Sequence, residues 1–234
     1  MFVNFVKKYQ IHKRLVRTIF FAPIIISILI GALFISSETK EFGFWLMEEN
    51  APVEILTFII FLFSGICGIY FTLKLKKLLK IEIKLFYILF SFCLILIAME
   101  EVSWGQWFFH FETPSGWAKI NGQGETTLHN LNGMQGNSEI LRMFFGLAGI
   151  LGIILSYFDR FKIISAPPIL IFWFLIIFCH AMIDFIQDKV VISQQYDFAI
   201  VKTSEFIELL IAGSSFLYLW LNFRVLNKKS ANLI

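Results

Sequence analysis

The sequence predicts an all-α, polytopic membrane protein with about six transmembrane helices. Hydrophobic residues make up 58% of the 234 residues and charged residues only 16%, whereas soluble domains average about 45–50% and about 25%. The apolar residues are concentrated in long runs bounded by charged segments, which is typical of membrane spans. Residues 1–234 are therefore expected to form a single transmembrane domain.

Six apolar runs are the candidate spans, and a long polar connection separates the third from the fourth. The spans are expected at 18–35, 55–73, 85–104, 142–158, 167–186 and 205–223, with an ordered extracytoplasmic loop over 105–138. The first run exceeds the apolar core of a signal peptide, about 7–15 residues, and is interpreted as a retained helix. Glycines in the second and fourth runs (Gly65, Gly68, Gly146, Gly149 and Gly152) are expected at close helix contacts.

Basic residues divide sharply between the two sides of this topology. The N-terminal arm carries five, residues 74–84 carry five, "DRFK" carries two and "RVLNKK" three, which is 15 of the 20. Because basic loops stay in the cytoplasm, both termini are expected to be cytoplasmic and the protein to lie in the inner (cell) membrane. Of the 17 acidic residues only Glu82 and Asp159 fall on that side, where the polar residues are mainly lysines.

The net charge and the positions of the cysteines limit which binding partners are expected. A net charge of +3 is mild and indicates no nucleic-acid partner. The three cysteines, Cys67, Cys93 and Cys179, all lie within apolar runs, so neither a disulfide framework nor a cysteine metal site is expected. The expected surroundings are the lipid bilayer, with a lipid or lipid-linked molecule as the candidate substrate.

The stretch "AMEEVSWGQWFFHFETP" places two carboxylates at the end of an apolar helix. A span needs roughly 20 residues to cross about 30 Å of hydrocarbon. Counted from Lys84, such a span ends near Trp104, so Glu100 and Glu101 are expected in the outer leaflet or at its edge. A carboxylate at that depth normally faces the protein interior, a partner or a water-filled cavity. Alternatively, both side chains mark the helix end and extend outward to the interface.

Two further pairs of polar residues are spaced four apart. In "ETTLHNL", Glu125 and His129 would share one face if the segment is helical, which suits a metal or a carboxylate–imidazole pair; the alternative is a loop with a local ion pair. In "CHAMID", His180 and Asp184 lie deep in the fifth span. An imidazole there needs a partner, so the pair predicts either a site residue with an orienting carboxylate or a tie between helices.

The second and sixth spans also begin with acidic residues. "SEFIELL" suggests Ser204 as an N-cap and Glu205 in the first turn, whereas Glu208 lies a turn deeper and indicates a site. "EENAPVE" suggests that Asn50 caps the second span, with Glu54 in its first turn. Together the candidate residues occupy one membrane face; they are Glu54, Glu100, Glu101, Glu125, His129, His180, Asp184 and Glu208.

The segment from Glu100 to Leu131 resembles a family of bacterial multi-pass membrane proteins. Their pattern is Glu-Glu-Ile/Val-Ser-Trp-Gly-Gln followed by Gln-Gly-Glu-Thr-x-Leu-His-Asn-Leu, and "EEVSWGQ", Pro114, "NGQGETTLHNL" and "EENAPVE" fit it. The resemblance implies a shared site and names no chemistry. The arrangement also looks loosely like the ceramidase-type membrane hydrolases, which hold zinc near one membrane face. It departs from them because His180 is followed at the fourth position by Asp184, not by a second histidine.

These observations lead to three functional hypotheses. The first is a hydrolase or transferase for a lipid or lipid-linked substrate. In it, His129, His180, Asp184, Glu208 and Glu54 hold a divalent metal, while Glu101, Glu100 and Glu125 supply acid–base catalysis. Zinc is the first expectation, with manganese or iron as alternatives. The second is a non-catalytic sensor or assembly subunit, and the third is a proton- or cation-coupled transporter or channel. A bound metal favours the first, a site without a cavity the second, and a continuous polar path the third.

Overall fold

The chain folds as an all-α, polytopic membrane protein in a computed structural model. The structure describes residues 2–77, 79–121, 125–128, 138–187 and 194–231. Within these residues, six helices are long and apolar enough to cross a membrane, as the composition predicts. The regular elements are α1 (Phe2–Tyr9), α2 (Lys13–Ile35), α3 (Lys40–Leu46), α4 (Pro52–Lys74), α5 (Ile81–Glu101), η1 (Ser103–Gly105), α6 (Gln106–Phe109), α7 (Ser115–Ala118), α8 (Ser138–Leu155), η2 (Asp159–Phe161), η3 (Pro168–Leu170), α9 (Ile171–Gln187) and α10 (Gln194–Ala231).

The helix boundaries differ from the predicted spans mainly in the third and the sixth. The third span was predicted to reach Trp104, but α5 ends at Glu101. Ser103 and Trp104 have φ values of 47° and 55°, a left-handed conformation that cannot continue a right-handed helix. The sixth span was predicted to begin at Glu205, whereas α10 begins at Gln194 and has 38 residues. It therefore extends well beyond the roughly 20 residues that a bilayer requires.

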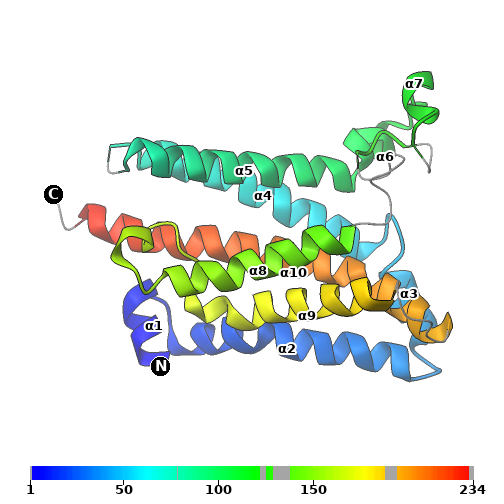
Figure 1. The fold of residues 1–234 in the computed structure, drawn as a ribbon, viewed down its shortest axis with the longest axis horizontal. Helices are drawn as coiled ribbons and strands as arrows, with labels where there is room; N and C mark the ends of the chain where they lie inside the picture. Colours follow the sequence, from blue (N-terminus) through cyan, green and yellow to red (C-terminus); the bar gives the residue numbers. More distant parts are fainter. Residues whose placement is uncertain (1, 78, 122–124, 129–137, 188–193, 232–234) are drawn as a thin grey trace.

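Helix α10 is the centre of the bundle. It contacts α4, α8 and α9, while α5 packs outside α4 and α2 packs outside α9 (Figure 1). In its most apolar stretch 67% of the residues are buried, against 17% in α2. The outer helices consequently present most of their apolar side chains to the bilayer, where lipid tails solvate them.

Glycines allow two of the helix pairs to pack closely, as the sequence predicts. A Cβ atom at Gly146 of α8 would lie 2.8 Å from the backbone nitrogen of Phe178 on α9. At Gly65 of α4, a Cβ atom would lie 2.6 Å from the carbonyl oxygen of Ser91 on α5. Both distances are too short for a real side chain, so these contacts require glycine.

The two ends of the bundle have different chemistry. We call one the basic end; it holds both chain termini, the connection from α4 to α5 and the connection from α8 to α9 (Figure 1). The other is the carboxylate end, which holds the first turns of α4 and α8 and the last turns of α5 and α9. Six spans place both termini at the same end, as predicted.

The basic end contains a buried polar network that the sequence did not reveal. The hydroxyl of Tyr87 on α5 donates to the carbonyl oxygen of Ile163 at 2.5 Å, and the hydroxyl of Tyr218 on α10 donates to that of Ile164 at 2.7 Å. Asn222 Nδ2 donates to the Ser165 carbonyl at 3.1 Å. The basic end thus holds a buried set of polar side chains in addition to its lysines. The network fixes the α8–α9 connection to α5 and α10, because buried backbone carbonyls need donors.

Candidate functional site

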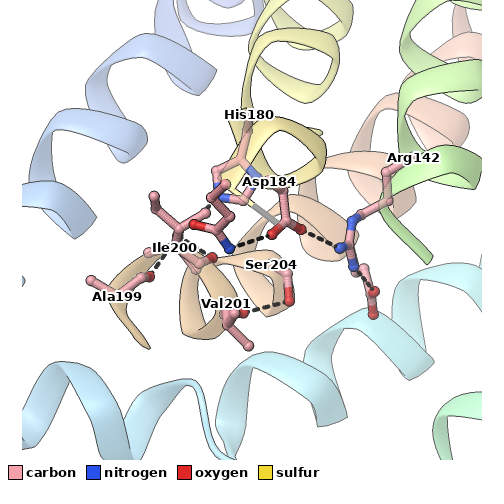
Figure 2. Close-up of polar contacts among 10 residues, drawn as sticks. Arg142, His180, Asp184, Ala199, Ile200, Val201 and Ser204 are labelled. Atoms are coloured by element: carbon pink, nitrogen blue, oxygen red, sulfur yellow. Dashed lines mark hydrogen bonds and ion pairs between the residues drawn. The ribbon is translucent and has the colours of Figure 1, made fainter. Parts of the chain in front are cut away.

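Arg142 connects three helices at the carboxylate end. Its side chain projects from the second turn of α8, where Nη2 donates to Asp184 Oδ2 of α9 at 2.7 Å. Its Nη1 donates to Glu208 Oε1 of α10 at 2.9 Å. Figure 2 shows the guanidinium group between the two carboxylates. A planar guanidinium suits this arrangement because its donors point in fixed, divergent directions.

The ion pairs of Arg142 are shielded from solvent. The side chains of Arg142 and Asp184 are only 8% and 10% exposed, whereas that of Glu208 is 28% exposed. Asp184 also accepts a hydrogen bond from Gln187 Nε2 at 2.9 Å, which satisfies its second oxygen. Buried charges persist only when they are paired and hydrogen-bonded, so Arg142 fixes the positions of both carboxylates.

His180 binds a hydroxyl group on the neighbouring helix. Its Nε2 lies 2.9 Å from Thr203 Oγ1 of α10, and that hydroxyl lies 2.9 Å from the Ala199 carbonyl (Figure 2). Because the hydroxyl has one proton, which the helix carbonyl can accept, Nε2 of the imidazole is assigned as the donor. Among the described residues, Nδ1 is buried without a partner. The hydrogen-bond partner of His180 is therefore Thr203, whereas the spacing in the sequence predicted a pair with Asp184.

The two adjacent glutamates of α5 face different surroundings. Glu101 lies within electrostatic reach of Glu208, Glu205 and Glu54, so it faces the bundle. Glu100 accepts hydrogen bonds from the indole nitrogen of Trp104 and, at 2.7 Å, from the backbone nitrogen of Leu128. Neighbouring helical residues differ by about 100° in direction, which explains why Glu101 faces the helices while Glu100 anchors the loop.

Glu54, Glu101, Glu205 and Glu208 form what we call the carboxylate cluster. Each member is partly buried, and each lies within electrostatic reach of at least two others. Glu54 also accepts a hydrogen bond from the backbone nitrogen of Asn50. A narrow depression beside the cluster is too small to hold a water molecule, and it is lined by Asn50, Glu54, Ile55, Glu101, Val102 and Trp107.

Two predicted helix caps are wrong. Ser204 lies inside α10 and donates to the Val201 carbonyl at 2.6 Å, so it is not an N-cap (Figure 2). Asn50 precedes α4 with a φ of 62°, and the residue at the cap position is Ala51. Instead, the backbone N–H of Asn50 donates to the carboxylate of Glu54 in the first turn. In the predicted cap, the Asn50 side chain would have accepted from a backbone N–H of that turn.

The predicted pairing of Glu125 with His129 requires a helix, and the described part of that segment is not helical. Residues 125–128 are irregular, and the backbone nitrogen of Glu125 donates to the Asn121 side chain at 3.2 Å. Glu125 is partly buried and lies within electrostatic reach of Glu54. His129 lies outside the described residues.

The described residues do not fit a metal site. Within the ranges that the structure describes, no group of three or more His, Cys, Asp or Glu side chains could hold a metal ion. Arg142 already binds two of the expected ligands, Asp184 and Glu208. The imidazole Nε2 of a third, His180, is bonded to Thr203. Zinc, manganese or iron at this end stays a prediction from the sequence.

Sequence reasoning missed Arg142, Gln187 and Thr203. Arg142 carried the clearest signal, since it is the one basic residue of the largely apolar helix α8. An ionisable residue in that position requires a partner. Gln187 and Thr203 carried no comparable signal, because amide and hydroxyl side chains are ordinary near helix ends.

Comparison of the chain with protein-family models, with curated proteins and with solved structures finds no match. The resemblance of residues 100–131 to the bacterial family, and the analogy with the ceramidase-type hydrolases, therefore stay predictions.

Proposed function

We propose that this protein is a membrane hydrolase or transferase that acts on a lipid or lipid-linked substrate at its carboxylate end. Its orientation is proposed from the distribution of Lys and Arg, with the basic end in the cytoplasm and the chain in the inner membrane. The site then faces the outer leaflet.

The observation that carries the proposal is the inward direction of Glu101. Glu54, Glu205 and Glu208 lie around it, on two other helices, and Glu54 and Glu101 line the same narrow depression. Carboxylates that share a confined site can hold a proton between them. Such a group can therefore donate a proton from one member while another accepts one.

The proposed reaction is general acid–base hydrolysis of an ester or phosphoester bond. Glu101 takes a proton from water as the water oxygen bonds to the carbonyl carbon or phosphorus atom. The bond from that atom to the leaving oxygen breaks, and a protonated carboxyl group of the cluster supplies the proton that the leaving oxygen gains. In transfer, an alcohol replaces the water and the proton balance is unchanged.

Arg142 has a positioning role in this proposal. Its two ion pairs fix Asp184 and Glu208 at the contact of α8, α9 and α10. A fixed Glu208 keeps its distance from Glu101 constant, as acid–base catalysis requires. The proposed steps use the carboxylates of the chain itself, and a metal at this end stays a prediction from the sequence.

The surroundings of the site support a lipid substrate. Trp104, Phe108 and Phe109, which follow α5, are 40%, 50% and 78% exposed. Exposed aromatic residues beside the end of a span are typical of the membrane interface. The ring of Phe108 lies 5.9 Å from that of Phe58 on α4, which attaches this aromatic segment to the helix that carries Glu54. These aromatic residues support a position of the cluster near the depth where a lipid carries its ester bonds.

The test is the turnover of a bacterial polar lipid extract by purified protein in liposomes, followed by mass spectrometry. We expect Glu101→Gln to reduce turnover by about 10²–10⁴, the usual contribution of a general acid or base. Glu41→Gln is the control, because Glu41 is an exposed carboxylate on α3 at the same end. The proposal is wrong if wild-type protein turns over no lipid, or if both variants turn over lipid equally.

A second candidate function is a non-catalytic assembly subunit, and the two ion pairs of Arg142 favour it. Arg142 joins α8, α9 and α10 through two ion pairs, which by themselves would stabilise the bundle. In that case Glu101→Gln alters stability or partner binding while lipid composition stays unchanged. Proton- or cation-coupled transport, the third hypothesis, stays a prediction.

A further inference from the structure

We infer that α1 and the connection from α8 to α9 bind the phosphate group of an anionic phospholipid in the leaflet at the basic end. The inference goes beyond the proposed function and is independent of it, because this surface lies at the opposite end of the bundle from the carboxylate cluster. Two residues carry it, Lys8 in the last turn of α1 and Lys162 directly after η2. We call them the lysine pair.

Helix α1 lies across the end of the bundle, beside the connection from α8 to α9 (Figure 1). Its apolar residues share one helix face and pack against the core; they are Phe2, Phe5, Val6 and Tyr9. Lys7 and Lys8 are exposed. An amphipathic helix with lysines on its polar face is typical of the membrane interface. The lysines of α1 are therefore expected at the level of the lipid headgroups.

Arg224 of α10 fixes the C-terminal end of α1. Its Nε donates to the Tyr9 carbonyl at 2.9 Å, and its Nη2 donates to the Gln10 carbonyl at 2.7 Å. Carbonyl groups at a helix end attract nearby lysines, which is the ordinary reason for a lysine in the last turn. Because Arg224 already binds these carbonyls, the end of α1 does not need the ammonium group of Lys8 as well.

The lysine pair brings two positive charges together. Lys8 lies within electrostatic reach of Lys162, and partial burial together with this neighbouring charge lowers the pKa of Lys8. Among the described residues Lys8 has no carboxylate partner, whereas Lys162 has one, the exposed Asp159. An ammonium group has three donors, so Lys162 keeps two for another acceptor. A phosphate between the two ammonium groups would offset their repulsion and accept hydrogen bonds from both.

Exposed apolar side chains near the lysine pair favour a lipid over a soluble anion. Tyr157 and Phe158, which precede η2, are 78% and 57% exposed, and Val3 of α1 is 56% exposed. Exposed aromatic residues beside the end of a span are typical of the headgroup level. At that level, anionic phospholipids are the negative charges that a basic surface meets. The surface therefore fits a phospholipid whose phosphate contacts the lysine pair while its chains lie in the bilayer.

The test is the binding of single phospholipids to detergent-purified protein, measured by native mass spectrometry. Phosphatidylglycerol is the anionic probe, and phosphatidylcholine, whose headgroup also carries a cation, is the comparison. We expect phosphatidylglycerol to bind more tightly. Lys8→Met and Lys162→Met should each weaken its binding by about tenfold, because each variant loses a hydrogen bond between charged groups.

Two further variants distinguish a site from a general effect of charge. Lys76→Met combined with Lys77→Met removes two exposed lysines from the connection between α4 and α5 at the same end, and it should leave the affinity for phosphatidylglycerol unchanged. Asp159→Asn removes the carboxylate that competes for Lys162 and should strengthen binding. Asp159 is exposed, so this variant tests the inference even if a lysine variant does not fold.

Three outcomes would overturn the inference. They are equal affinity for the two lipids, phosphatidylglycerol binding that both single lysine variants leave intact, and an equal loss of binding in the control double variant. Competition with sn-glycerol 1-phosphate separates a lipid from a soluble phosphate. If this compound displaces phosphatidylglycerol as effectively as added lipid does, the surface binds soluble phosphates and its assignment to a lipid is wrong.

Discussion

Replacing Arg142 with methionine should destabilise the protein strongly. Methionine keeps much of the length of the side chain but removes the charge, leaving Asp184 and Glu208 without their guanidinium partner. Leaving a buried charge without its partner costs about 3–5 kcal/mol, more than the pair itself contributes. The effect comes from the stranded carboxylates, not from a cavity.

The magnitude can be worked out from the two contacts. A hydrogen bond to a charged group contributes about 1.5–3 kcal/mol. The Asp184 contact should carry the upper part of this range because that side chain is 10% exposed, whereas water partly solvates Glu208, which is 28% exposed. Together they indicate a loss of about 3–4 kcal/mol in the free energy of unfolding. For a chain of this size, the loss corresponds to a decrease in Tm on the order of 10 °C.

Thermal unfolding of detergent-purified protein, followed by tryptophan fluorescence, measures this loss. Arg160→Met is the control, since Arg160 is an exposed residue of η2 at the basic end. A double variant, Arg142→Met with Asp184→Asn, should recover part of the loss because it removes one of the stranded charges. The reasoning is refuted if Arg142→Met unfolds at the same temperature as Arg160→Met, or if the two changes in the double variant are simply additive.

Two further predictions concern the packing of the helices and the response to alkaline pH. Gly146→Ala should lower the free energy of unfolding by about 1–3 kcal/mol, because the new Cβ atom would lie 2.8 Å from the Phe178 backbone. Gly31→Ala is the control and should not destabilise the protein, because a Cβ atom there meets nothing within 4 Å. Equal thermal stability of the two variants would contradict the packing argument. Burial raises the pKa of the Tyr9 hydroxyl, so above about pH 10 the unfolded chain releases this proton while the folded chain keeps it, and stability falls as pH rises. Tyr9→Phe should reduce that alkaline loss in a pH series of unfolding measurements, and an unchanged slope would show that the hydroxyl does not contribute.

The fold was predictable because membrane spans are recorded locally in the sequence. A run of apolar residues has no other stable location than a bilayer or a protein core, so all six spans were found, and the helical structure followed from the need to satisfy every backbone group. The boundaries were less predictable. The left-handed backbone at Ser103 and Trp104 ends α5 early, and α10 extends beyond the bilayer to Gln194, where Phe198 packs against Phe44 of α3.

The candidate site was only partly predictable, because its chemistry depends on which side chains meet. Spacing along one helix suggested that His180 and Asp184 formed a pair, but the structure directs His180 to Thr203 and Asp184 to Arg142 and Gln187. Gln187 lies three residues from Asp184 on α9. Arg142 and Thr203, however, come from α8 and α10, and no local pattern encodes contacts with another helix.

The sequence by itself predicted a helical, polytopic membrane protein, and the described residues form six helices long and apolar enough to span a membrane. It also predicted that the acidic residues gather at one end. Hydrophobicity and charge decide these properties residue by residue, because each side chain exchanges water for lipid independently of its distant neighbours. Only the tertiary structure decided that Glu101 faces the bundle while Glu100 anchors the loop, and that a guanidinium holds two of the carboxylates. Those outcomes depend on the rotation and packing of whole helices, since a buried charge is stabilised by whichever partner the packing brings within hydrogen-bond distance.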